Sequence, residues 1–280
     1  MISIIIPVLN EADTISRLLT HLIENSSSKN ISEIIVVDGG STDGTQDMVK
    51  DFVTSSDSER SKELHREAFL DVLDTKFQKR NFTRTDVLDN AKRDPESSSG
   101  LANKSNILLI NSAKGRAKQM NLGAKHATGS ILYFLHADSF PPKDFDQFIL
   151  NEVQKGNQAG CFRMQFDSNH WWLRLASWLT QFSWRASRGG DQSQFITKTL
   201  FNDIGGYNEN YIIYEDNILI NELYARNEFT VINKKLTTSA RLYRKHGVWK
   251  LQYHFWTIYV KKWLGASAQD LLYYYKKNIC

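Results

Sequence analysis

The 280-residue sequence has few of the features that mark several large protein classes. It has two cysteines, Cys161 and Cys280, which excludes a disulfide framework and a cysteine-rich zinc site and fits a reducing cytoplasm. No uncharged apolar run approaches the ~20 residues that span a bilayer, and the first residues lack the basic segment of a secretory signal. The formal charge of +4 is too small at this length to indicate nucleic-acid binding.

Two nucleotide-binding motifs are also missing. A dinucleotide-binding protein would carry GxGxxG after its first strand, where this chain has Leu9-Asn10-Glu11. The pattern GxxxxGK[ST] of the P-loop does not occur either. These absences disfavour dinucleotide-dependent oxidoreductases and P-loop NTPases.

The apolar content of 41% is enough for a real core. Apolar runs over residues 2–8, 34–37, 107–110 and 131–135 predict buried strands, and the helical spacing between them predicts helices, one of them over 116–127. Strands that alternate with helices indicate crossover connections and a parallel sheet. Residues 51–104 are polar and break this alternation, so they predict an insertion that is partly helical and partly mobile.

The second half of the chain has a different pattern. Residues 160–166 and 194–197 predict further strands. An apolar stripe at helical spacing consists of Trp171, Leu175, Trp178, Leu179 and Phe182. The last forty residues are rich in aromatic and basic side chains and predict a helical extension over 248–280.

Polar side chains follow the predicted strands at the points where they end. The positions are Asn10 and Glu11 after the first strand, Asp38 after the second, Asp138 after the fourth, and Glu215-Asp216 at the start of a later helix. In a parallel sheet these ends meet at one edge, where ligands bind. Several carboxylates at one edge would repel each other unless a cation or a hydroxyl-rich ligand lay among them.

Seven motifs occur in order along the chain. They are Pro7-Val8-Leu9-Asn10-Glu11, Val36-Val37-Asp38-Gly39-Gly40-Ser41-Thr42-Asp43-Gly44-Thr45, residues 115–124, Leu135-His136-Ala137-Asp138, Gly190-Asp191-Gln192, Gly205-Gly206-Tyr207 and Glu215-Asp216. Each motif is weak alone, but the ordered set closely resembles the family-2 inverting glycosyltransferases of GT-A fold. Thr238-Ser239-Ala240-Arg241 resembles the bacterial subgroup of arsenosugar-biosynthesis type.

This resemblance covers nearly the whole chain except residues 51–104. It implies an α/β fold with a Rossmann-like, mostly parallel sheet flanked by helices over residues 1–247, followed by the extension at 248–280. It also implies a nucleotide-sugar donor and a divalent cation, Mn²⁺ or Mg²⁺, that bridges the donor diphosphate. Asp138 matches the metal ligand of the family. The donor-binding positions are then Pro7, Asn10, Glu11, Asp38, Arg116 and His136.

The same resemblance assigns the acceptor side of the site. Asp216 matches the catalytic base, which deprotonates the acceptor hydroxyl, and Glu215 holds it or contacts the acceptor. Gly190, Asp191 and Gln192 match a loop near the acceptor. Two alternatives stay open: a non-catalytic nucleotide-sugar-binding protein, and a protein that contacts membranes peripherally through its aromatic, basic end. A helix packed on the sheet or on a second copy of the chain is the other explanation of that end.

Overall fold

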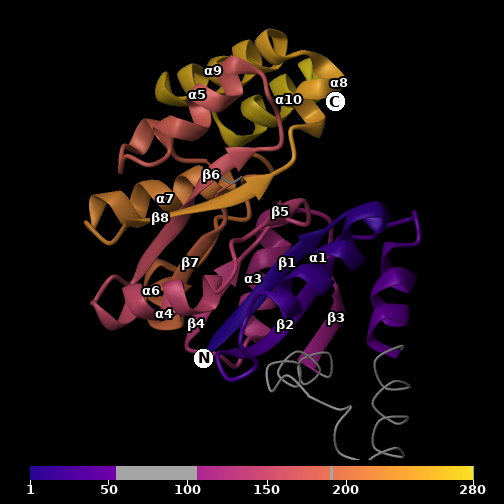
Figure 1. The fold of residues 1–280 in the computed structure, drawn as a ribbon. Helices are drawn as coiled ribbons and strands as arrows, with labels where there is room; N and C mark the ends of the chain where they lie inside the picture. The colour runs from indigo at the N-terminus through magenta and orange to yellow at the C-terminus, as the bar shows by residue number, and fades with distance from the viewer. Residues whose placement is uncertain (55–105, 190–191, 280) are drawn as a thin grey trace, which may run out of the picture.

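The computed structural model describes residues 1–54, 106–189 and 192–279 (Figure 1). The strands are β1 (Ile2–Val8), β2 (Ile31–Asp38), β3 (Ile107–Asn111), β4 (Ile131–Phe134), β5 (Ser139–Phe140), β6 (Ala159–Phe166), β7 (Gln194–Thr197) and β8 (Thr230–Thr238). The helices are α1 (Ala12–Glu24), α3 (Arg116–His126), α4 (Phe145–Gln154), α5 (Trp171–Leu179), α6 (Lys198–Ile204), α7 (Glu215–Ala225), α8 (Arg241–His246), α9 (Val248–Trp263) and α10 (Ala268–Asn278), with a short 3₁₀ helix at Arg185–Ser187. Residues 45–54 are also helical.

The strands form one sheet with the order β3-β2-β1-β4-β7-β6-β8-β5. From β3 to β4 all neighbours are parallel, and the carboxyl ends of these strands meet at one edge, as the sequence predicts. β1 lies inside this half and is buried on both faces, which explains its unbroken apolar run.

The other half of the sheet is mixed. β7 pairs antiparallel with β4 and β6, whereas β8 is parallel to β6 and antiparallel to β5. Four of the seven neighbouring pairs in the described sheet are parallel, including β6 with β8, so the sheet is mixed but mostly parallel, as the sequence predicts. Helices still separate β6, β7 and β8 along the chain, so the alternation of strand and helix does not by itself set strand direction here.

Helices cover both faces of the sheet. One core joins α1 and α4 to one side of β1, through Ile4 and Ile6, and the other joins α3, α6 and α7 to the opposite side, through Ile5. Gly123 of α3 allows close contact, since a Cβ there would lie 2.5 Å from Cγ2 of Ile5. The α/β class with flanking helices, predicted from the sequence, is confirmed.

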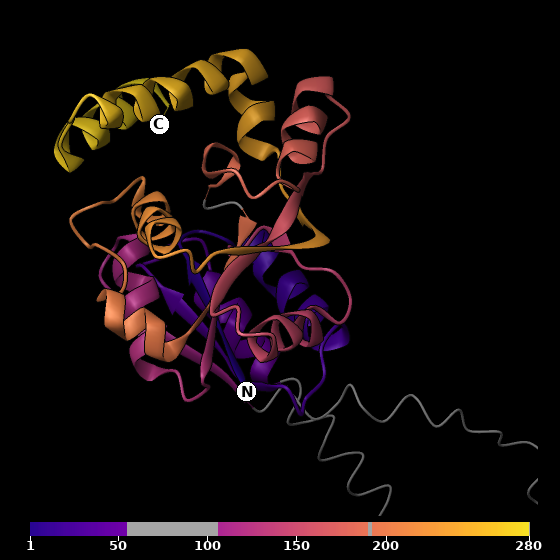
Figure 2. The same ribbon diagram turned by 90° about the vertical axis from the view of Figure 1, so that its left-hand side faces the viewer.

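Helices α5, α8, α9 and α10 gather at the end of the molecule away from the N-terminus (Figures 1 and 2). The apolar stripe on α5 faces solvent at two of its positions: Trp171 is 60% exposed and Trp178 is 50% exposed. Instead, Leu173 and Ser177 form the buried face of this helix. None of the described helices is both long and apolar enough to cross a bilayer.

The predicted insertion lies almost wholly outside the described residues. Its first residues, 51–54, continue the helix that begins at 45. Phe52 and Val53 pack against the core on the α1 side of the sheet. The start of this segment therefore belongs to the folded domain.

Candidate active site

Asn10 and Ser41 join the loops that follow β1 and β2. Asn10 has a left-handed backbone with φ of 57°, which Asn tolerates better than most residues. Its N–H donates to Oγ of Ser41 at 2.9 Å, and its Oδ1 accepts from the N–H of Thr42 at 2.9 Å. Pro7, near the end of β1, is half-buried and in register with Val37. The two predicted donor positions therefore lie at the junction of the first two parallel strands.

Asp38 ends β2 and is fully buried. Its carboxylate accepts from the Ser41 hydroxyl at 2.6 Å and the Ser41 N–H at 3.0 Å, and also from the Gln46 amide. These bonds hold the loop after β2 in place. Ser41 was not singled out in the sequence, although a Ser three residues after an Asp is a common turn pattern.

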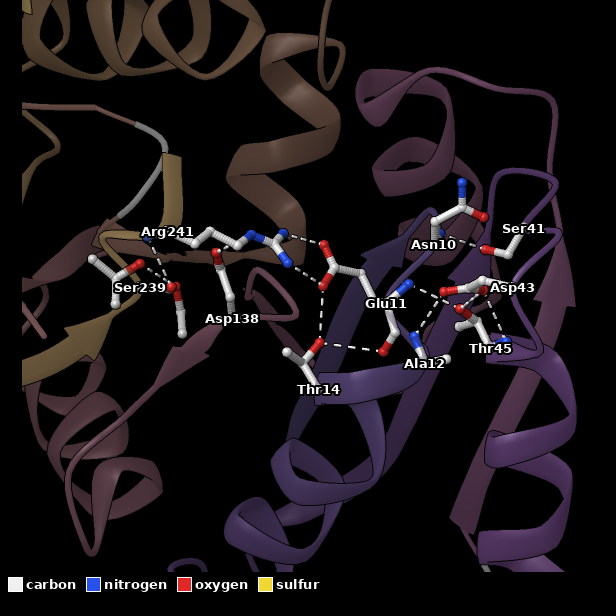
Figure 3. Close-up of polar contacts among 12 residues, drawn as sticks. Asn10, Glu11, Ala12, Thr14, Ser41, Asp43, Thr45, Asp138, Ser239 and Arg241 are labelled. Atoms are coloured by element: carbon white, nitrogen blue, oxygen red, sulfur yellow. Dashed lines mark hydrogen bonds and ion pairs between the residues drawn. The ribbon is translucent and has the colours of Figure 1, made fainter. Parts of the chain in front are cut away.

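Asp43 fixes the same loop to the first turn of α1 (Figure 3). Its carboxylate accepts from the Thr45 hydroxyl at 2.5 Å and from the Ala12 N–H at 3.0 Å. The bond from Thr45 is the main reason that the pKa of Asp43 lies below its usual value. Asp43 is thus a structural residue of the turn.

Arg241 lies between two carboxylates that are far apart in sequence (Figure 3). Its guanidinium donates to both carboxylate oxygens of Glu11, with Nη1 2.8 Å from Oε2. Its Nε lies 3.5 Å from Oδ2 of Asp138. The bonds to Glu11 raise the pKa of Arg241 despite its partial burial. The sequence predicted a cation or ligand among these acids, and the structure shows a cation supplied by the chain itself.

A second group of charges surrounds the start of α7. Glu215 and Asp216 are 1% and 7% exposed. Nη1 of Arg116, from the first turn of α3, lies 3.2 Å from Glu215 Oε1 and 3.4 Å from Asp216 Oδ2. Burial raises the pKa of Asp216, and Arg116 opposes this rise. A carboxylate with a raised pKa is a stronger base than a solvated one, so this pair can accept a proton.

Arg116 was predicted to bind the donor. In the structure it pairs with the two carboxylates of α7. His136 is half-buried just after β4, and its carbonyl accepts from the N–H of Ser139 at 3.1 Å. Its role as a donor-binding residue stays a prediction.

Of the predicted acceptor-side loop, Gly190 and Asp191 lie outside the described residues. Gln192 is 3% exposed. Its Oε1 accepts from Nη1 of Arg188 at 2.6 Å, and its Nε2 donates to the carbonyl of Ser187 at 2.5 Å. Both ends of the Gln192 amide are therefore bonded within its own loop. In this arrangement the side chain stabilises the loop, and its predicted role at the acceptor sugar stays a prediction.

Two further polar residues support the site and were missed in the sequence. Gln119 of α3 is 4% exposed, and its amide donates to the carbonyls of Val8 and Val37, each at 2.8 Å. Gln119 thus supplies hydrogen-bond donors to backbone carbonyls at the ends of β1 and β2. Arg188 is 2% exposed, and its Nη2 donates to the carbonyls of Thr180 at 2.5 Å and Phe182 at 2.6 Å. A long polar side chain gives no periodic signal, so burial of this kind cannot be recognised from sequence.

The donor set around Asp138 suits a metal that arrives with a substrate. Within residues 1–54, 106–189 and 192–279, no group of three or more His, Cys, Asp or Glu side chains could hold an ion. Mg²⁺ and Mn²⁺ sites of phosphate-transferring enzymes commonly use one or two carboxylates and complete the shell with phosphate oxygens and water. Asp138, with His136 nearby in sequence, fits that arrangement and does not form a preassembled cage.

Comparison with known proteins identifies the family. The model of the family described as glycosyl transferase family 2 matches residues 3–68 and 87–212, more than half of the chain. The chain belongs to glycosyl transferase family 2. Within the predicted insertion at 51–104, the family model leaves only residues 69–86 unmatched. The glycosyltransferase AglE of Haloferax volcanii is 40% identical over 57 residues, which are 20% of this chain and 19% of AglE.

Solved structures support the GT-A-type fold of this family 2 chain. TarS of S. aureus, solved with UDP, has a TM-score of 0.58 at 16% identity, and the match covers 85% of this chain and 60% of TarS 1–349. The mannosyltransferase PcManGT of Pyrobaculum calidifontis has a TM-score of 0.54 at 18% identity, covering 92% of this chain and 59% of that chain. This family 2 chain therefore spans about 60% of the length of these two proteins.

Proposed function

We propose that this chain transfers a sugar from a nucleotide-sugar donor to an acceptor hydroxyl, with inversion at the anomeric carbon. The observation that carries the proposal is the buried Glu215-Asp216 pair beside Arg116. An inverting reaction needs no enzyme nucleophile, but it needs a base for the acceptor and positive charge for the departing diphosphate. The raised pKa of Asp216 supports its role as that base.

The donor belongs at the loops after β1 and β2. Asn10 and Asp38 shape this region, with Pro7 at the end of β1. Two of the similar solved proteins support a nucleotide-sugar donor, since TarS was solved with UDP-GlcNAc and PcManGT with GDP-Man and Mn²⁺. Two different bases occur in these complexes, so the base of this chain's donor is left to experiment.

Asp138 and His136 would hold a divalent cation at the donor diphosphate. Such an ion supplies positive charge that stabilises the leaving group. Arg241 already lies between Glu11 and Asp138 and offers a second cation on this side. Arg116 keeps Asp216 in place while its carboxylate takes the proton of the acceptor hydroxyl.

Glu215 lies next to the base and is a candidate for contacting the acceptor. The subgroup resemblance of Thr238-Ser239-Ala240-Arg241 keeps arsenic-containing sugars among the acceptors to be tested.

A donor screen tests the proposal. The stability of the full chain is measured by thermal shift with UDP-GlcNAc, GDP-mannose and other nucleotide sugars, each with and without Mn²⁺. We expect one base to stabilise the protein, and to do so more strongly with Mn²⁺. Release of the nucleoside diphosphate is then followed with a panel of acceptors and with water alone. Donor binding without turnover under any of these conditions would favour the non-catalytic alternative.

A further inference from the structure

Helix α9 presents an apolar stripe to solvent. Its members recur at alternating intervals of four and three residues, which places them on one side of the helix. They are Trp249 (51% exposed), Tyr253 (63%), Trp256 (49%), Val260 (52%) and Trp263 (84%). The opposite side carries Leu251 and Ile258, which are buried against α10 and its surroundings. The helix therefore has a packed face and a second apolar face that stays largely exposed in the described part of the chain.

Helix α5 extends this apolar surface. The ring centroid of Trp171 lies 5.7 Å from that of Trp249, and the Trp172 ring lies 5.4 Å from Trp249 and 5.8 Å from Trp256. Both views show α5 and α9 at the same end of the molecule (Figures 1 and 2). We name Trp171 and the α9 stripe the aromatic surface. Contiguous exposed apolar patches on a protein surface commonly mark interaction sites.

The segment that carries the aromatic surface is rich in positive charge. Residues 239–280 contain eight Lys and Arg residues and a single acid, Asp270, whereas the whole chain has a formal charge of only +4. α9 itself has three lysines and no acidic residue: Lys250 near its start, and Lys261 and Lys262 in its last turn. Lys250 is exposed, whereas Lys262 donates to the hydroxyl of Tyr211 on the packed side. A ligand on this surface thus meets an apolar strip with lysines near both ends of the helix.

We propose that the aromatic surface docks this protein on an anionic lipid bilayer. Trp and Tyr are the side chains that favour the boundary between water and lipid headgroups, and flanking lysines are attracted to anionic lipids. A second copy of the chain fits less well, because a symmetric pair would bring the same lysines together. A coiled-coil pairing of two α9 helices would also favour Leu, Ile and Val along the shared stripe, where this chain has mainly Trp and Tyr.

The aromatic surface is close to the candidate active site. Tyr259 of α9 contacts Tyr214, with 5.3 Å between ring centroids, and Tyr214 directly precedes Glu215 and Asp216. α8, whose first residue is Arg241, leads directly into α9. Docking would therefore hold the candidate active site near the membrane. The inference stands on surface chemistry and does not depend on the proposed transfer reaction.

Vesicle flotation of the full chain tests the proposal. The probes are phosphatidylcholine vesicles and vesicles of phosphatidylcholine mixed with phosphatidylglycerol, at low and high salt. We expect binding to the anionic vesicles, with weaker binding to neutral ones and at high salt. The variant Tyr253→Ser/Trp263→Ser should bind roughly tenfold more weakly or worse, because two exposed aromatic anchors are lost. Lys250→Gln should bind about fivefold more weakly.

Matched controls lie at other exposed positions. Leu108→Ser on β3 replaces a 46% exposed apolar side chain, and Lys29→Gln removes an exposed lysine ahead of β2; both should bind like the wild type. Absence of wild-type binding to anionic vesicles would overturn the proposal. So would equal losses in the control variants. A concentration-dependent dimer in sedimentation velocity that Trp263→Ser abolishes would assign the surface to a second copy instead.

Discussion

Asp216→Asn should abolish most of the turnover and at the same time stabilise the fold. The two effects have one cause. Asp216 is buried next to Glu215, and both carboxylates share one half-exposed cation, Arg116. Burial raises the pKa of Asp216 above the ordinary value of 3.8. The ionised form is therefore less favourable in the folded chain than in the unfolded one, and its cost is paid at every pH above the folded pKa.

The expected magnitudes follow from this environment. General-base catalysis is typically worth about 10²–10⁴ in rate, so turnover should fall by roughly that factor. Because burial raises the pKa of Asp216, replacing its carboxylate with a neutral amide should increase the free energy of unfolding and, with it, Tm. The gain should be absent at low pH and appear as pH rises above 3.8, because only the ionised wild type is penalised.

Three measurements check this prediction. Nucleoside diphosphate release gives turnover with the donor and acceptor found in the screen, calorimetry gives donor affinity, and thermal melts give Tm across pH. Donor affinity should stay near the wild-type value because the base faces the acceptor. Asp203→Asn serves as control, since its exposed carboxylate pairs with Arg226 on the surface. Normal turnover with weakened donor binding would refute the reasoning and make Asp216 a donor ligand, with Glu215 or Asp191 as the next candidates for the base.

Four other outcomes are expected. Asp138→Asn should remove the Mn²⁺-dependent part of nucleotide binding in calorimetry without changing Tm in the absence of ligand; unchanged affinity with Mn²⁺ would contradict its role. Gly123→Ala should lower stability by about 1–3 kcal/mol in denaturant melts, because the new Cβ lies 2.5 Å from Cγ2 of Ile5. The pKa of Glu33 is lowered because hydrogen bonds outweigh the opposing effect of burial, so its contribution to stability is present above 4.5 and lost as pH falls; Glu33→Gln should melt lower at neutral pH and less so in acid. A Gly/Ser linker in place of residues 69–86 should leave Tm and donor binding unchanged, and a clear loss of Tm would mean that they pack on the domain.

The parallel half of the fold could be predicted because its strands are apolar on both faces. The run Ile2–Val8 needs no alternation to be recognised, and β1 has these bounds. The mixed half was harder to predict from the sequence, because strand direction depends on loops and pairing that leave no periodic pattern. The stripe on α5 could be predicted only in part: helical spacing shows that Trp171 and Trp178 share a side of the helix, but not that this side faces solvent.

The candidate site could be predicted as a set of acids, but not as ion pairs. Strand ends identify Glu11 and Asp138, whereas their shared cation comes from Arg241, far away in sequence. Arg116 likewise pairs with carboxylates about a hundred positions later, which no local pattern could reveal. The roles of the predicted site residues, the arsenosugar subgroup and the cytoplasmic location stay predictions.

The bond between Glu11 and Arg241 has a consequence for how the protein is made. The two residues are separated by 230 positions, nearly the whole length of the chain. A nascent chain emerges from the ribosome with its N-terminal end first, so β1, β2 and the loop of Asn10 can form while Arg241 is still unsynthesised. Until then Glu11 lacks its cation. The donor side of the candidate site is therefore among the last parts of the molecule to have its carboxylate paired with a cation. A chain released early would fold its first strands around an incomplete site.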